Sequence, residues 1–105
     1  MLNQVVIVGR IVQDLEIKEL ENGKKVANLT LAVQRPYKDE NGEYGTYFID
    51  CDLWEGIATN VNEYCHKGDI VGVKGRIQTV MNGKKKITKV CAEKVTFLSS
   101  KKKDE

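Results

Sequence analysis

The chain has 105 residues, of which 41% are hydrophobic and 30% charged, and its formal net charge at pH 7 is +2. This length and composition are typical of one soluble globular domain. No apolar run approaches the roughly 18 residues that a membrane-spanning helix needs, and the start of the chain lacks the features of a signal peptide, so we expect a cytoplasmic protein with no membrane partner.

Five strand-like segments, rich in Val, Ile, Thr or aromatic residues, are predicted along the chain. They cover residues 4–15 (QVVIVGRIVQDL), 25–35 (KVANLTLAVQR), 44–54 (YGTYFIDCDLW), 69–80 (DIVGVKGRIQTV) and 86–98 (KITKVCAEKVTFL). Asn-Gly, the strongest short hairpin signal, occurs at residues 22–23, 41–42 and 82–83. It predicts hairpins between the first and second, second and third, and fourth and fifth strands.

The remaining junction, residues 55–67, reads EGIATNVNEYCHK and is predicted to be helical. Its apolar residues recur at helical spacing; they are Ile57, Ala58, Val61, Tyr64 and Cys65. Gly68 follows them as a helix stop signal. Three antiparallel strands, a helix and two further strands is the order of the OB-fold, a five-stranded, partly open barrel. We therefore predict an all-β OB-fold barrel with one helix between strands 3 and 4, over residues 1–98, and a short charged tail over residues 99–105.

The third strand carries an unusual mixture of side chains on one face. Alternation assigns to the core face Tyr47, Ile49, Cys51 and Leu53, and to the other face Phe48, Asp50, Asp52 and Trp54. Phe48 and Trp54 are then roughly 20 Å apart at about 3.3 Å per residue, which suits two separate stacking platforms. Aromatic residues that stack on unpaired bases, interleaved with Lys and Arg that contact phosphates, are typical of sequence-tolerant single-strand binders.

The second and fourth strands alternate in the same way. The predicted core residues are Ala27, Leu29, Leu31, Val33, Val71, Val73 and Ile77, and the predicted outward residues are Asn28, Thr30, Ala32, Gln34, Lys74, Arg76 and Gln78. Residues 53–105 carry 11 basic and 6 acidic groups, whereas residues 1–52 carry 6 and 9. A basic second half attracts polyanions such as nucleic acid or an acidic membrane, although lysines also form ordinary solvated surfaces.

Other interpretations of single residues do not predict a catalytic or metal site. Trp54 could be a surface-edge aromatic residue. Three cysteines without paired spacing favour reduced thiols in the core over disulfides or a metal site; they are Cys51, Cys65 and Cys91. His66, the only histidine, has no partners for catalysis, and Asp50 with Asp52 does not match a nuclease motif. We expect a protein that is not an enzyme and has no cofactor and no metal.

Three segments together resemble the bacterial and phage single-stranded DNA-binding proteins over about residues 3–79. They are NQVVIVGRIVQDLEI, NGKKVANLTLAVQRPY and CDLWEGIATNVNEYCHKGDIVGVKGRIQT. The resemblance implies base stacking at Tyr37, Phe48 and Trp54, and basic contacts at or near Lys67 and Arg76. We add to the predicted DNA-binding set Arg35, Lys74, Lys84, Lys85 and Lys86. The resemblance implies sequence-independent binding and protection of single-stranded DNA in replication, recombination and repair, associated with the nucleoid.

The sequence also departs from that family. The loop between the last two strands is the short MNGKKK, and Asp50 and Asp52 lie on the predicted binding face, where they either pair with Lys74 or Arg76 or face away from the DNA backbone. The chain as given ends in KKKDE, so recruitment of replication proteins through an acidic tip is not supported. An OB-fold module for RNA or for a protein partner stays open as the alternative, because the DNA assignment rests on the resemblance.

The first strand predicts self-association. Residues 5–8 are consecutive apolar residues, so they point to both faces of the sheet, and only one face can meet the core. An open strand edge with outward apolar side chains would favour aggregation in a monomer. We therefore expect a partner subunit to cover this edge, with Gln4, Val6 and Val8 in the interface. The resemblance implies the same, and we predict a homotetramer, with a homodimer as second choice.

Overall fold

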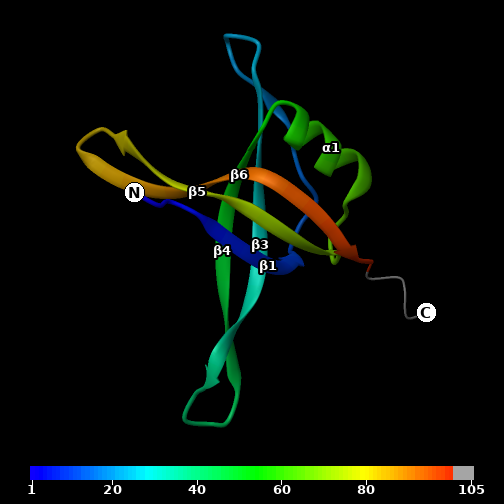
Figure 1. The fold of residues 1–105 in the computed structure, drawn as a ribbon, viewed down its shortest axis with the longest axis vertical. Coiled ribbons are helices and arrows are strands. Elements are labelled where there is room, and N and C mark those ends of the chain that lie inside the picture. Colours follow the sequence, from blue (N-terminus) through cyan, green and yellow to red (C-terminus); the bar gives the residue numbers. More distant parts are fainter. Residues whose placement is uncertain (101–105) are drawn as a thin grey trace.

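The computed structural model of the chain describes residues 1–100 (Figure 1). In chain order its elements are β1 (Val5–Ile11), β2 (Lys18–Glu19), β3 (Lys25–Lys38), β4 (Tyr44–Trp54), α1 (Gly56–Tyr64), β5 (Ile70–Asn82) and β6 (Lys85–Ser99). The predicted all-β chain with one helix, placed between the third and fourth long strands, is confirmed over these residues. Most of the predicted tail, residues 101–105, lies outside the described residues. No helix within residues 1–100 is long and apolar enough to cross a bilayer.

The five long strands close into a barrel. The strand order is β1-β5-β6-β4-β3-β2, and β1 additionally pairs with β3. That closing contact joins Arg10 to Ala32 and Ile11 to Leu31, while β4 and β6 meet in parallel at only Cys51↔Val90 and Asp52↔Cys91. In Figure 1 the β3–β4 pair runs across the direction of β1, β5 and β6. The predicted OB-fold barrel is therefore confirmed.

The buried core is formed by every long strand together with α1. Its residues are Ile11, Ala27, Leu29, Leu31, Cys51, Leu53, Ala58, Val61, Val71, Val73 and Ala92. Alternation along β3 and β4 explains this set, because every second side chain points into the barrel. Ala58 and Val61 lie one helical turn apart, so α1 presents one apolar stripe to the barrel.

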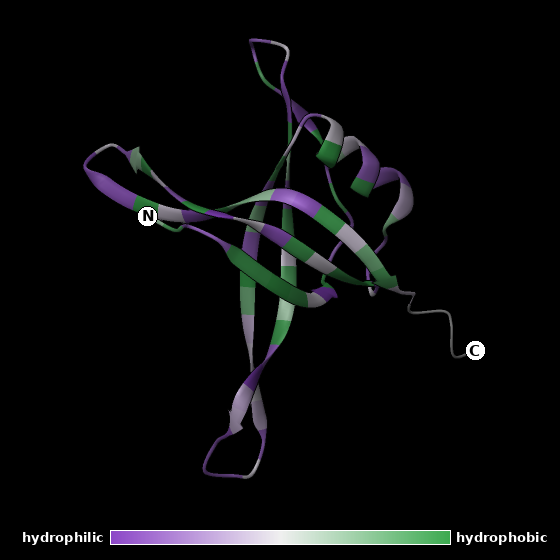
Figure 2. Ribbon diagram, in the orientation of Figure 1, coloured by the Kyte–Doolittle hydropathy of each residue, from purple (hydrophilic) through white to green (hydrophobic). Residues whose placement is uncertain are grey.

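The three Asn-Gly pairs lie in hairpin turns, as predicted. Each glycine has a positive φ, which is 86° at Gly23, 77° at Gly42 and 66° at Gly83. Glycine adopts this conformation readily because it has no Cβ. The β3–β4 and β5–β6 hairpins extend well beyond the crossing of the strands, and Figure 2 shows that their tips are hydrophilic.

The predicted end of the first strand is wrong. β1 ends at Ile11 instead of residue 15, and the hairpin at Asn22-Gly23 joins the two-residue strand β2 to β3. The reason is barrel closure, since β1 leaves β5 after Arg10 to contact β3. Gly9 permits this close approach, because a Cβ there would lie 2.9 Å from the carbonyl oxygen of Ala32.

Three residues that the sequence assigned to apolar faces are exposed. Tyr47 on β4, Ile77 on β5 and Tyr64 on α1 retain 41%, 46% and 66% of their accessible area. β4 and β5 continue past the barrel, and within residues 1–100 the face that alternation would bury stays exposed there at Tyr47 and Ile77. The pairing of β1 with β5 stops at Val5↔Gly75, so Ile77 lies beyond it.

Candidate nucleic-acid interface

The outer face of the β3–β4 hairpin holds the two aromatic residues that the sequence singled out. Phe48 lies opposite Ala32, and Trp54 lies opposite Val26, so both have small or medium neighbours across the ladder. Phe48 is 67% exposed. The ladder runs without a register shift from Phe48 to Trp54. The two residues are six positions apart, so alternation places them on the same face of β4, as predicted.

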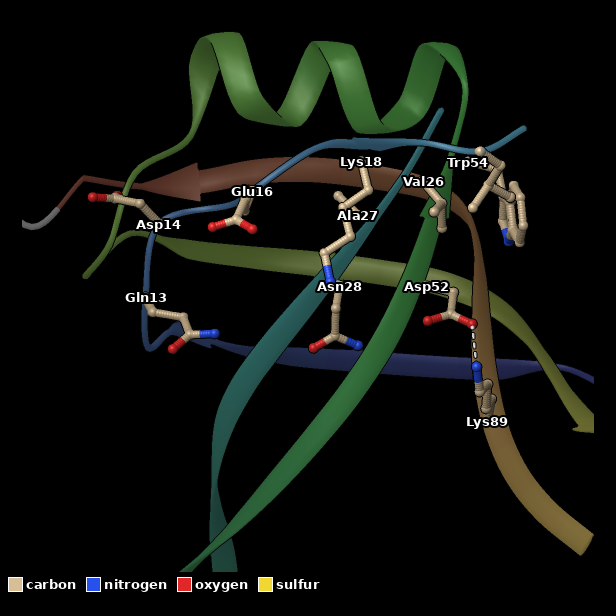
Figure 3. Close-up of a pocket in the computed structure, with 11 residues that line it drawn as sticks. Gln13, Asp14, Glu16, Lys18, Val26, Ala27, Asn28, Asp52, Trp54 and Lys89 are labelled. Carbon is tan, nitrogen blue, oxygen red and sulfur yellow. Dashed lines mark ion pairs between the residues drawn. The ribbon is translucent and has the colours of Figure 1, made fainter. Parts of the chain in front are cut away.

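The two carboxylates between these aromatic residues have partners within the face. Thr30 Oγ1 donates a hydrogen bond to Asp50 Oδ1 at 2.6 Å. Asp52 Oδ2 lies 3.4 Å from Lys89 Nζ, an ion pair that Figure 3 marks. Lys89 comes from β6, which β4 meets in parallel next to Asp52. Neither the predicted pairing with Lys74 nor that with Arg76 occurs in the structure.

Trp54 lies between two open grooves. The first, of about 650 Å³, is bounded by the loop after β1, by β2 and by the outer β3–β4 face. Figure 3 shows Trp54 at one end of this groove, with Asp14 and Glu16 at some distance along it. The second groove, of about 470 Å³, is lined by Lys24, Trp54, Ile57, Arg76, Gln78, Cys91, Ala92 and Glu93. Trp54 therefore lines both grooves. Cationic side chains line each groove as well: Lys18 and Lys89 in the first, Lys24 and Arg76 in the second.

Tyr37 and Arg35 lie on the other face of the hairpin from Phe48. The Arg35 guanidinium carbon is 5.1 Å from the centre of the Tyr47 ring, a cation–π contact. Gly45 leaves room for it, because a Cβ there would be 2.7 Å from Arg35 Nη1. A hydrogen bond with Tyr37 is the largest cause that raises the pKa of Tyr47 above its ordinary value. The predicted set of three aromatic residues is thus divided between two faces.

The remaining predicted basic residues do not gather around Trp54, except Arg76. Lys74 lies on the outer surface between Val6 of β1 and Lys94 of β6. Lys67 follows α1, and its backbone N–H donates to Asp14 Oδ1 at 2.9 Å, which ties this loop to the rim of the first groove. At the tip of the β5–β6 hairpin lie the exposed residues Lys84, Lys85 and Lys86.

Residues that the sequence analysis left out also line the grooves. Lys24 lies in the second groove with Trp54, and counting the register of β3 against β4, in which Val26 faces Trp54, could have found it. Lys89 carries no local signal, because only the long-range parallel contact of β4 with β6 brings it to Asp52. Lys38, whose Nζ lies 5.7 Å from the centre of the Tyr44 ring, adds a cation near the hairpin tip.

The strand predicted to form a subunit interface is exposed. Val6 and Val8 retain 71% and 54% of their accessible area, and Gln4, just before β1, is exposed as well. Figure 2 shows β1 as hydrophobic along most of its length. Within the described residues, β3 pairs only with Arg10 and Ile11 of β1, so the edge of residues 5–8 that faces away from β5 has no strand paired with it.

Two of the thiols lie in surroundings that disfavour their ionised form. Burial raises the pKa of the Cys51 thiol to about 11, and burial is also the largest cause that raises the pKa of Cys65. A raised pKa disfavours the thiolate, which is the nucleophilic form. Among residues 1–100, no three His, Cys, Asp or Glu side chains are placed to hold a metal ion.

Comparison with known proteins identifies similar chains. The sequence model of the Single-strand binding protein family matches residues 2–98. The chain is 46% identical over 103 residues to a single-stranded DNA-binding protein of Halalkalibacterium halodurans, a match that covers 93% of this chain and 61% of that protein. It is 40% identical over 106 residues to single-stranded DNA-binding protein B of Bacillus subtilis, covering 96% and 94% of the two chains.

A solved structure is similar in fold. The crystal structure of a deletion mutant of the single-stranded DNA binding protein from Thermus aquaticus superimposes with a TM-score of 0.79 at 25% sequence identity. This match covers 93% of the present chain and 51% of the Thermus chain. Like the Halalkalibacterium protein, of which the chain spans less than two thirds, the Thermus chain extends well beyond the matched region.

Proposed function

The chain belongs to the single-strand binding protein family, whose sequence model matches residues 2–98, and on this premise we propose that it binds single-stranded DNA without sequence dependence. One observation carries the proposal. Phe48 and Trp54 lie on one face of β4, and the Phe48 ring is 67% exposed although it is among the most apolar side chains of the protein. Unpaired bases offer such rings a stacking partner whatever their sequence.

We infer that phosphates are contacted by cations beside each platform. Arg76 and Lys24 share a groove with Trp54, and Lys89 lines the groove on the other side of the indole. Asp50 accepts a hydrogen bond from Thr30, and Asp52 is paired with Lys89, so the face can take bases over these carboxylates while the phosphates follow the cations. Tyr37, Arg35 and Tyr47 then extend the contact around the edge of the hairpin to its other face.

We also propose the setting of this activity. The domain over residues 1–98 acts as a non-catalytic binder that protects exposed single strands during replication, recombination and repair, in the cytoplasm and associated with the nucleoid. It assembles as a homotetramer, with a homodimer as second choice. The exposed Val6 and Val8 beside the open edge of β1 support this assembly.

Titration of tryptophan fluorescence tests the proposal directly, because Trp54 is the only tryptophan. Oligo-dT should quench the emission at micromolar or lower concentration, whereas duplex DNA of equal length should quench weakly, because its bases are already stacked on one another. Equal quenching by oligo-U and oligo-dT would favour RNA as the ligand, and no quenching by either would contradict single-strand binding at this face.

The salt dependence of binding tests the cations separately. Replacing Lys84, Lys85 and Lys86 by Gln should flatten the plot of log affinity against log salt concentration, by about 0.7 for each phosphate that the protein no longer binds. An unchanged slope would exclude the tip of the β5–β6 hairpin from the binding surface.

A further inference from the structure

One cation of the second groove, Arg76, is already paired with a carboxylate. Arg76 Nη1 donates to Glu93 Oε2 at 2.9 Å, and the two side chains are 42% and 47% exposed. Both residues line the same groove as Trp54. A base stacked on the indole therefore brings its phosphate to an arginine that already donates one N–H to a carboxylate and is paired with its negative charge.

A β-bulge places Glu93 in this position. Across β5 and β6, Lys74 faces Lys94 and Gly75 faces Ala92, so Glu93 is the extra residue of β6. Such a bulge redirects side chains and strengthens the local twist. Gly75 allows it, because a Cβ at this position would overlap the backbone carbonyl oxygen of Cys91. The bulge thus places Glu93 within reach of Arg76.

The carboxylate and a phosphate make the same demand on Arg76. Both are anions whose oxygens accept hydrogen bonds from guanidinium, and arginine binds them in the same geometry. The N–H that points to Glu93 can serve only one of them at a time, and the carboxylate repels a phosphate that approaches the other N–H groups of the guanidinium. The first groove has the same arrangement, because Asp52 forms an ion pair with Lys89 there. In each groove beside Trp54, one cation is therefore paired with a carboxylate of the protein.

We propose that Glu93 is an intramolecular competitor of DNA phosphate at Arg76. This inference rests on the proposed single-strand binding. When a strand binds, Arg76 exchanges the Glu93 carboxylate for a phosphate, and the released Glu93 takes up a cation from solution. That uptake offsets a counterion that DNA releases, so this contact adds less to the affinity and to the salt dependence than a free arginine would.

Glu93→Gln tests the proposal, with Glu63→Gln as the matched control. Both changes remove one negative charge, but Glu63 lies on the exposed side of α1 and lines neither groove beside Trp54. Affinity is measured by fluorescence anisotropy of labelled oligo-dT over a range of NaCl concentrations. Glu93→Gln should tighten binding at low salt by roughly two- to fivefold, the factor that an exposed ion pair represents, and should steepen the salt slope by about 0.7. Glu63→Gln should leave the slope unchanged.

The Arg76→Gln background distinguishes competition from a general charge effect. In that background Glu93→Gln should no longer steepen the slope, because no cation is set free. Glu93→Ala should reproduce the effect of Glu93→Gln in the natural background, which guards against a contact made by the new amide.

The outcomes separate the two proposals. If the natural chain does not bind oligo-dT, the proposed function fails. If it binds, and Glu93→Gln behaves like Glu63→Gln or steepens the slope equally without Arg76, the competitor role is wrong and the single-strand binding stands.

Discussion

At the scale of single residues, the two proposed stacking platforms can be removed without changing a core residue. Phe48→Ala and Trp54→Ala should each weaken binding to oligo-dT by about 1–3 kcal/mol, the value of one base stack. Anisotropy of a labelled oligonucleotide is the suitable readout, because Trp54→Ala removes the only tryptophan. Tyr64→Ala, which removes a 66% exposed ring from α1, is the matched control and should bind normally. A folded Phe48→Ala variant with full affinity would exclude Phe48 from the binding face.

The buried thiol of Cys51 makes stability depend on alkaline pH. Its pKa rises from 9.0 to about 11, mainly because burial disfavours the thiolate. Between these values the unfolded chain loses the thiol proton and the folded chain keeps it, so the free energy of unfolding should fall by about 2–3 kcal/mol as pH rises through this window. Denaturant unfolding of the natural chain and of Cys51→Ala at pH 8 and pH 11 isolates the effect from lysines and tyrosines. An equal loss in both proteins would contradict it.

Some residues of the candidate interface could be predicted from the sequence and others could not. Phe48 and Trp54 follow from alternation along one strand, which needs only local information. The partner of Asp52 does not, because Lys89 is 37 positions away and meets it only through the parallel contact of β4 with β6. The same limit explains Glu93, whose direction depends on a bulge that no residue pattern in β6 reveals.

At the scale of elements, the bulge between β5 and β6 should depend on Gly75. Gly75→Ala should destabilise the fold by about 1–3 kcal/mol, the usual cost of overpacking, because the new Cβ overlaps the Cys91 carbonyl oxygen. Gly72 on the same strand is the matched control, since the nearest atom to a Cβ there is Leu98 Cδ1 at 3.7 Å. Thermal unfolding of the two variants compares them. Equal stability of both would show that the strand pair relaxes around the methyl group.

The elements themselves were predictable where local chemistry decides them. Asn-Gly pairs marked all three hairpin turns, and apolar spacing marked α1. The ends of the strands and the exposure of Tyr47 and Ile77 were not predictable from the sequence. The part of each strand that packs against the core depends on where the barrel closes. That closure is set by Gly9 and its contact with Ala32, which are 23 positions apart.

At the scale of the whole molecule, β1 decides the proposed assembly. Light scattering should give a mass of four chains of 11.8 kDa, or of two, at micromolar concentration. Val6→Lys should reduce that mass, because it places a charge in the apolar seam, while Val6→Leu should preserve it. A natural chain that remains a monomer would contradict the assembly and leave the barrel and its outer β3–β4 face unaffected.

The barrel is held together by two short seams, and this has a consequence for its motions. β1 meets β3, and β4 meets β6, through two residue pairs each, whereas the β3–β4 and β5–β6 ladders are long. The molecule can therefore breathe by parting at the seams while each hairpin stays intact, and amide hydrogens there should exchange with solvent before those of the long ladders. Trp54 belongs to one side of the β4–β6 seam and Arg76 to the other. A strand of DNA that contacted both would act as a clamp, so amide exchange at the β4–β6 seam should slow when oligo-dT binds.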